Sequence, residues 1–198
     1  MTVATRLRFA LLVSLLVQAA AGVPGAAAAA PAYEVDRAQS SLTFVGDQQG
    51  EKFIGTIRSF RAAIRYSPSD LATSLLDVSM DLKSIDTKNS ERDAALATAV
   101  WFDYAHTPVA TFRSVGPLRA TKDGAVADAD LVIKGKSKRI TFPFRWTPAA
   151  GGAALDAKVS LDRLDFGLGA GEWADDSIIG HRVDVIVHLA LKPAAPSP

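Results

Sequence analysis

The sequence contains no cysteine, and this absence excludes several classes of protein at once. Without a thiol there are no disulfides, no lipid attached through a cysteine, no thiol nucleophile and no cysteine-ligated metal. Histidine is scarce as well, with three in 198 residues. A folded domain of this composition must be stabilised by its hydrophobic core.

A strong excess of one charge is also absent. The chain has 22 Lys and Arg against 21 Asp and Glu, for a formal net charge of +1. Proteins that bind nucleic acid electrostatically carry a basic patch or a clear positive excess. The charge balance therefore argues against a nucleic-acid partner.

No complete nucleotide-binding motif is present, although fragments of such motifs occur. The stretch 165–167 spells the kinase triplet Asp-Phe-Gly, and alternate glycines over 167–171 begin a dinucleotide loop. The third glycine of that loop is replaced by Glu172, and the string Gly-Lys-Ser at 135–137 lacks the first glycine of a P-loop. We interpret these matches as coincidence.

The first 32 residues are typical of a secretory signal peptide. Arg6 and Arg8 form a positively charged N-terminal region, and residues 9–17 are almost wholly apolar. Small residues over 26–32 then provide possible sites for signal-peptide cleavage. We therefore expect residues 1–32 to be removed and the protein to be periplasmic or secreted. A membrane anchor is the alternative, because the apolar stretch approaches spanning length if the alanines are counted.

Alternation of apolar and polar residues predicts that the rest of the chain is all-β. The clearest run is RITFPFRW over residues 139–146, in which every second side chain is large and apolar. The same pattern occurs over residues 60–66 and 76–82. Further strands are predicted over residues 42–45, 110–115, 130–133, 155–161 and 183–191.

One α-helix is predicted near residues 90–102. Ser90 and Asp93 form a capping box, and good helix formers follow over residues 94–99. About eight antiparallel strands with one apolar face either close into a barrel or pack as a two-sheet sandwich. Alternation alone does not distinguish these two architectures.

Five blocks, in order, resemble the YceI family of exported polyisoprenoid-binding proteins. The blocks are YEVDRAQSSLTF (33–44), SIDTKNSERDAAL (84–96), WFDYAHTPVATF (101–112), LVIKGKSKRITFPF (131–144) and LDRLDFGLGAGEW (161–173). The resemblance runs from Tyr33 to Leu191. It departs from the family where many members have a histidine, at Ala95 and after the first strand, so no role of those histidines is transferred.

The resemblance implies an extended, lipocalin-like antiparallel β-barrel that holds a long isoprenoid chain in its interior, with no cofactor. We expect this domain over residues 33–192, followed by a disordered tail over 193–198. For any single residue of the apolar faces, packing as ordinary core is the alternative to lining a cavity. The predicted ligand-binding residues are Phe60, Ile64, Met80, Phe112, Ile133, Phe142, Phe144 and Trp146.

The glycine-rich stretch after residue 161 is predicted to form the rim of the cavity. Arg163 and Asp165 alternate with apolar residues at a strand end, and the glycines that follow permit positive φ. Trp173 would cap the opening with its indole partly in water. An ordinary glycine-rich turn is the alternative to a flexible rim.

Three functional classes follow from these features. We favour a carrier of a long-chain isoprenoid lipid, of polyprenyl phosphate or quinone type. A binder of fatty acids or fatty amides is the second class. An enzyme acting on such lipids is disfavoured, because no nucleophile–base pair or metal motif is visible, even around Asp175, Asp176 and His181. The family also suggests a membrane cytochrome or quinone-linked partner, and the oligomeric state is left open.

Overall fold

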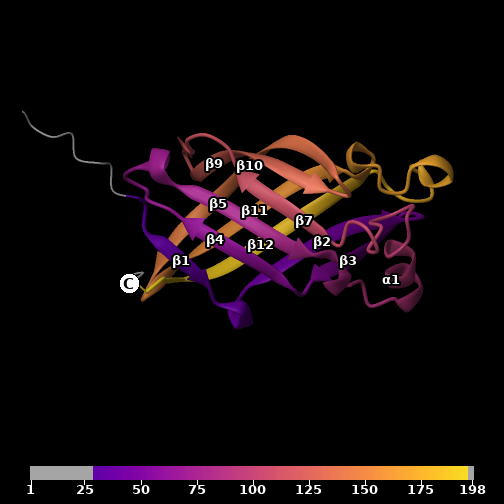
Figure 1. Cartoon of the computed structure of the whole chain (residues 1–198), viewed down its shortest axis with the longest axis horizontal. Coiled ribbons are helices and arrows are strands. Elements are labelled where there is room, and N and C mark those ends of the chain that lie inside the picture. Colours follow the sequence, from indigo (N-terminus) through magenta and orange to yellow (C-terminus); the bar gives the residue numbers. More distant parts are fainter. Residues whose placement is uncertain (1–28, 196–198) are drawn as a thin grey trace, which may run out of the picture.

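A computed structural model describes residues 29–195 of the chain (Figure 1). Most of the predicted signal peptide, residues 1–28, and the last three residues of the predicted tail lie outside this range. No helix within residues 29–195 is both long and apolar enough to cross a membrane.

The described chain folds into one antiparallel sheet, and eight of its strands close into a barrel. Around the ring the order is β1-β4-β5-β7-β9-β10-β11-β12, and β12 pairs back onto β1. The strands are β1 (Ala32–Val35), β2 (Ser41–Gln48), β3 (Glu51–Ile57), β4 (Phe60–Arg65), β5 (Leu75–Asp81), β6 (Ile85–Asp86), β7 (Val109–Ser114), β8 (Arg119–Thr121), β9 (Gly124–Ile133), β10 (Lys136–Ala149), β11 (Gly152–Asp162) and β12 (Arg182–Pro193). The prediction of a closed barrel is confirmed, and the sandwich is excluded.

The long strand β12 makes the two ends of the barrel different. Its last residues pair with β1, where Val35 faces Leu191. Its first half pairs with β2, where Val45 faces Asp184, and β3 and β6 continue the sheet beyond β2. In Figure 1, β1 and the C-terminal end of β12 lie at the left, whereas the helix α1 lies at the right.

The inward face of β10 confirms the predicted alternation. Phe142 and Phe144 are buried, whereas the residues between and beside them are exposed. Each ring is paired across the ladder with an alanine of β9, Ala127 and Ala125 respectively. A small residue beside each large one leaves room for the ring inside a narrow barrel.

The turn between β9 and β10 is a two-residue hairpin turn. Lys134 and Gly135 both have positive φ, 49° and 71°. This conformation matches the right-handed twist of the two strands that it joins. Tight turns of this kind fix the register of the barrel wall.

The helix α1 spans Ser90–Leu96, so the prediction of a helix to about residue 102 is wrong at its C-terminal end. The backbone N–H of Phe102 donates to the carbonyl oxygen of Leu96 at 3.1 Å, and the Thr98 hydroxyl donates to the carbonyl of Ala95 at 2.8 Å. These bonds replace further helical turns and bring the chain back to the barrel.

The cap of this helix also differs from the prediction. Asn89 is the N-cap residue, and its side-chain oxygen accepts a hydrogen bond from the backbone N–H of Arg92 at 2.9 Å. The Asp93 carboxylate does not close a capping box with Ser90. It accepts from the backbone N–H and the hydroxyl of Thr87, at 3.0 and 2.7 Å, and so ties the helix to the strand before it.

Candidate functional site

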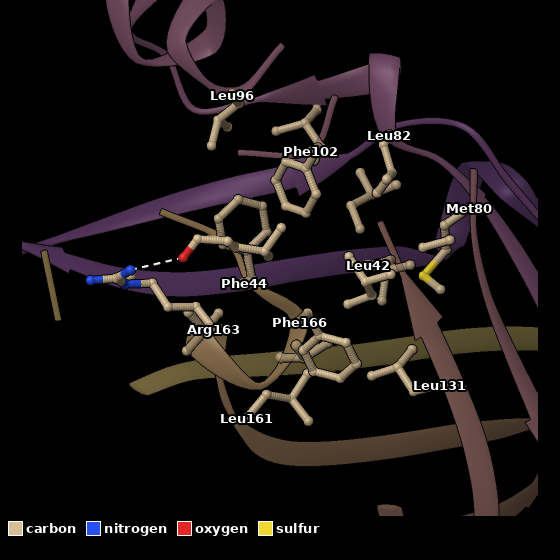
Figure 2. Close-up of a pocket in the computed structure, with 18 of the residues that line it drawn as sticks. Leu42, Phe44, Met80, Leu82, Leu96, Phe102, Leu131, Leu161, Arg163 and Phe166 are labelled. Atoms are coloured by element: carbon tan, nitrogen blue, oxygen red, sulfur yellow. Dashed lines mark hydrogen bonds between the residues drawn. The ribbon is translucent and has the colours of Figure 1, made fainter. Parts of the chain in front are cut away.

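An apolar cavity of about 400 Å³ occupies the barrel interior. This volume lies within the range of roughly 300–1,000 Å³ that is typical of small-molecule sites. Figure 2 shows Leu96 and Phe102, from α1 and the turn after it, on one side of the cavity, with Leu161 and Phe166 on the opposite side. The helix and the loop after β11 therefore both contribute to the cavity wall.

Six of the eight residues predicted to bind the ligand line this cavity. They come from neighbouring strands of the wall, as the alternation requires. The six are Phe60, Ile64, Met80, Phe112, Ile133 and Phe142. Their contact with a ligand stays a prediction.

The other two predicted residues, Phe144 and Trp146, do not line the cavity, and this part of the prediction is wrong. Their rings pack against Tyr66, with centroid distances of 5.6 and 4.3 Å, and Trp146 also meets Tyr33 edge-on at 4.9 Å. We call these four residues the aromatic plug. Burial raises the pKa of the Tyr66 hydroxyl, in keeping with a dry cluster. Alternation assigned both rings to the correct face but could not show how far along the barrel the empty volume extends.

Several residues that line the cavity were missed by the prediction. Valines of β12 occupy inward positions on a strand that was predicted. Trp101 and Phe102 were assigned to a helix and instead turn toward the cavity. The lining residues missed include Leu42, Phe44, Phe53, Val159, Leu161, Phe166, Leu168, Val183, Val185 and Val187.

Two glycines make room for aromatic rings of the neighbouring strand in the wall formed by β2 and β3. A Cβ added to Gly46 would stand 2.5 Å from the Phe53 ring, and one added to Gly55 would overlap the ring of Phe44. Each ring therefore covers a glycine of the neighbouring strand instead of projecting into the interior. This arrangement leaves volume free, and the sequence signal for it is an inward-facing glycine beside an aromatic residue.

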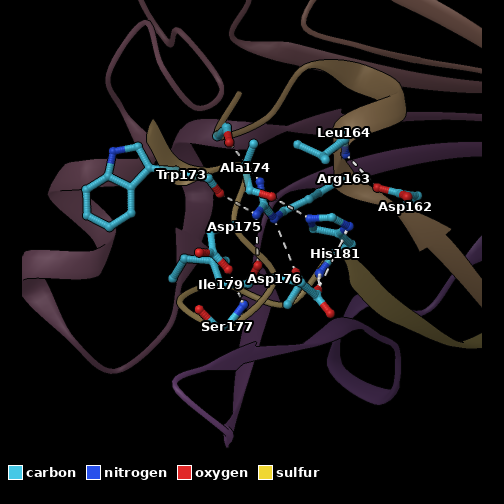
Figure 3. Close-up of polar contacts among 12 residues, drawn as sticks. Asp162, Arg163, Leu164, Trp173, Ala174, Asp175, Asp176, Ser177, Ile179 and His181 are labelled. Atoms are coloured by element: carbon cyan, nitrogen blue, oxygen red, sulfur yellow. Dashed lines mark hydrogen bonds and ion pairs between the residues drawn. The ribbon is translucent and has the colours of Figure 1, made fainter. Parts of the chain in front are cut away.

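Arg163 lines the cavity, as predicted for a rim residue, but it is buried, with 3% of its surface exposed. Its side chain donates five hydrogen bonds of 2.5–3.2 Å to backbone carbonyl oxygens. Figure 3 shows Arg163 beside two of the acceptor residues, Trp173 and Ile179. The acceptors are the carbonyls of Leu168, Gly169, Trp173, Ile179 and Gly180. Burial lowers the pKa of the guanidinium, and the charges of Asp162 and Asp176 oppose that shift. Because all five N–H donors are used, Arg163 acts as the internal support of residues 163–181, which we call the mouth segment.

Gly169 locks the mouth segment to the turn after α1. Its φ is +63°, and an added Cβ would approach both the Trp101 ring and the Arg163 guanidinium within 3 Å. Its N–H donates to the carbonyl of Val100 at 2.9 Å. Gly169 is thus required for the close packing of the mouth segment against Trp101.

The other two predicted rim residues, Trp173 and Asp165, lie in different environments. Trp173 lies at the mouth, lines the cavity and keeps 37% of its surface exposed. Asp165 does not line the cavity, and its prediction as a rim residue is wrong. It is exposed and forms an ion pair with Lys138 at 2.9 Å on the outer surface, because it points away from the buried Arg163 within one 3₁₀ turn.

Within residues 29–195, no group of three or more His, Asp or Glu side chains is placed to hold a metal ion. Of the three candidates considered from sequence, Asp176 accepts from the backbone N–H of His181 at 2.6 Å, and Asp175 from that of Ser177 at 2.8 Å. The imidazole of His181 bonds to the carbonyl of Ala174 at 2.6 Å. These contacts shape the loop.

An apolar cavity inside a closed antiparallel barrel is the architecture of lipocalin-like proteins. Residues 33–191 match the family model described as a YceI-like domain, and the chain belongs to this family.

The relatives agree with this assignment. A UPF0312 protein of Vibrio cholerae is 28% identical over 165 residues, which cover 77% of this chain and 87% of the relative. Among solved structures, Burkholderia cenocepacia BcnA superposes with a TM-score of 0.75 at 27% identity, covering 79% of this chain and 98% of that one. A polyisoprenoid binding domain from Saccharophagus degradans, implicated in plant cell wall breakdown, shares the fold at 18% identity with a TM-score of 0.64, covering 83% and 99%.

Proposed function

We propose that this protein is an exported binding protein that holds a long-chain isoprenoid lipid, of polyprenyl phosphate or quinone type, in its barrel without modifying it. The observation that carries the proposal is the apolar cavity between the aromatic plug and the mouth. Transfer of an apolar chain from water to such a lining is favourable by about 0.8 kcal/mol per methylene. The fold shared with a polyisoprenoid binding domain supports the choice of lipid.

Binding can be tested on delipidated protein with geranylgeraniol, a branched unsaturated alcohol, and hexadecanol, a saturated one. The fluorescence of Trp101 and Trp173, which line the cavity, reports occupancy. We expect saturable binding that favours geranylgeraniol and raises the melting temperature. Absence of binding by either alcohol would reject the proposal, and a preference for hexadecanol would favour the fatty-acid class.

A matched pair of variants on β12 shows whether the lipid is inside the barrel. Val185 lines the cavity, whereas its neighbour Ile186 points outward and is 39% exposed. Val185→Phe fills part of the cavity and should weaken geranylgeraniol binding about tenfold or more, while Ile186→Phe should leave it unchanged. If both variants changed the affinity for geranylgeraniol equally, the lipid would not bind inside the barrel.

Export is part of the same proposal, and the fold refines the predicted cleavage site. Ala30 is 3% exposed, and the carbonyl of Pro31 accepts from the N–H of Tyr66 at 3.0 Å. Cleavage after Ala32 would remove both contacts, so we expect the mature chain to begin at Ala29. N-terminal sequencing of the protein from its producing cell tests this, and a chain that still begins at Met1 in the membrane fraction would contradict export.

A further inference from the structure

The polar residues of the cavity lining gather at the mouth. They come from β2, from the start of α1 and from the mouth segment, whereas the lining near the aromatic plug is apolar. The polar and charged lining residues are Asp47, Gln48, Asn89, Glu91, Arg92 and Arg163. A lipid with its tail toward the plug would therefore present its head group to these side chains.

Arg92 is the cation of this group that has hydrogen-bond donors to spare. Arg163 uses all five of its N–H groups on backbone carbonyls. Arg92 uses two, from Nε and Nη2, and both go to one neutral oxygen, Oε1 of Gln48, at 3.2 and 3.0 Å. Three N–H donors of Arg92 have no acceptor among the described residues.

The guanidinium of Arg92 is held in a fixed place. It lies over the Phe53 ring with its central carbon 4.0 Å from the ring centroid, and that ring in turn covers Gly46. The side chain is half-buried. A pre-positioned guanidinium loses little conformational entropy when it binds a planar or tetrahedral oxyanion.

Neighbouring carboxylates do not form ion pairs with Arg92 within residues 29–195. Asp47 pairs with Lys52 at 3.1 Å, and Asp93 accepts from Thr87. Glu91 also lines the cavity, and its charge opposes an anion at this position. Arg92 and Glu91 carry opposite charges. Neutralising Arg92 therefore makes the mouth less favourable for an anion, and neutralising Glu91 makes it more favourable.

We propose that Arg92 binds the phosphate of an isoprenoid phosphate lipid, with the guanidinium exchanging the side-chain oxygen Oε1 of Gln48 for phosphate oxygens. The inference rests on the proposed function and narrows its lipid class from phosphate or quinone to phosphate. The fork of the guanidinium matches a phosphate in a bidentate manner. Partial burial keeps the ion pair from being fully screened by salt.

Two pairs of ligands that differ only in the head group test this proposal by calorimetry on delipidated protein. Geranylgeranyl monophosphate should bind about tenfold or more tightly than geranylgeraniol. Palmitate compared with hexadecanol measures the same preference for a carboxylate on a saturated chain. Arg92→Gln should remove the phosphate preference while geranylgeraniol still binds, Arg92→Lys should retain part of it, and Glu91→Gln should increase it.

Arg145→Gln is the matched control, because Arg145 is an exposed arginine on the outer face of β10. A melting curve of each variant identifies any loss of folding, and the binding of geranylgeraniol shows that the cavity is intact. Equal affinities of the wild type for phosphate and alcohol, or a preference that survives Arg92→Gln, would overturn the inference while leaving isoprenoid binding in place. A head-group preference seen only with palmitate would overturn the choice of phosphate. Failure of every isoprenoid to bind would reject the proposed function itself.

Discussion

The two ends of the barrel are built from similar side chains and have opposite properties. At the end closed by β1, the rings of the aromatic plug lie against one another at 4.3–5.6 Å and fill the interior. At the end near α1, the rings of Phe44 and Phe53 lie against glycines of the neighbouring strands, and the volume beside them is free. Whether an aromatic residue packs the barrel or lines a cavity therefore depends on the partner of its ring.

The polar groups differ between the ends in the same way. The plug contains tyrosine hydroxyls and no charge, whereas the mouth holds Arg163 and Arg92 at the ends of a β-strand and a helix. Arg163 supports the mouth segment through backbone carbonyls, and Arg92 faces the cavity. The closed end thus contributes stability, and the open end combines a rigid loop with an accessible cation.

The largest expected effect comes from removing the support of the mouth. Arg163→Met leaves five backbone carbonyls without their donor in a buried site. We expect a loss of about 3–5 kcal/mol in the free energy of unfolding, or failure to fold. Chemical denaturation measures this, with Arg145→Met as an exposed control within about 0.5 kcal/mol of wild type. A loss for Arg163→Met no larger than the control would show that the loop is held by other contacts.

The plug and the cavity wall can be compared directly through two neighbouring phenylalanines of β10. Phe144→Ala removes a packed ring and should cost about 3–5 kcal/mol of stability with little change in lipid affinity. Phe142→Ala, at the cavity wall, should cost less in the empty protein and should change which chain lengths bind. Unfolding curves and lipid titrations of both variants decide the matter. If Phe144→Ala lost lipid binding with little loss of stability, Phe144 would line the cavity and would not belong to the aromatic plug.

A smaller effect is expected from the glycine that holds an aromatic ring at the mouth. Gly46→Ala forces the Phe53 ring away from the strand and disturbs the surface on which Arg92 rests. We expect about 1–3 kcal/mol of destabilisation from overpacking, together with weaker lipid binding. Thr43→Ala, on the outer face of the same strand, is the control. Unchanged affinity in Gly46→Ala would mean that the ring does not define the open volume.

The smallest effect concerns an ion-pair cluster around Asp184, near the start of β12. Contacts with Arg182, Ser160 and Lys158 hold the pKa of Asp184 well below its ordinary value. Because the folded pKa is depressed, this stabilisation is present above the unfolded value near 3.8 and is lost as the pH falls below it. The contribution is small since the site is exposed. Asp184→Asn should slightly flatten the loss of stability between pH 5 and pH 2, as thermal melts would show, and an unchanged profile would contradict this.

Much of the barrel could be predicted because β-strands alternate with a period of two. Residues 140–146 follow this rule, as the structure shows. The ends of the elements were harder, since Asn89 and Ser90 are both good capping residues and only the geometry selects one of them.

The candidate site was less predictable than the wall that surrounds it. A charged residue at a strand end is typical of an exposed rim, and nothing near Arg163 in the sequence indicates five carbonyl acceptors from the segment that follows. The division between the aromatic plug and the cavity depends on Tyr33 and Tyr66, which are far in sequence from Phe144. Local periodicity carries no information about such contacts.

The central claim is that the lipid lies in the barrel between the plug and the mouth. Met80 lines the cavity, and it is one of two methionines in the chain, the other being Met1. Protein that begins at Ala29 and is labelled with ¹³C at the methionine methyl group therefore reports on this position. Addition of geranylgeraniol should shift the Met80 methyl resonance and give cross-relaxation to the lipid chain. Saturable binding that leaves this resonance unchanged would contradict the account.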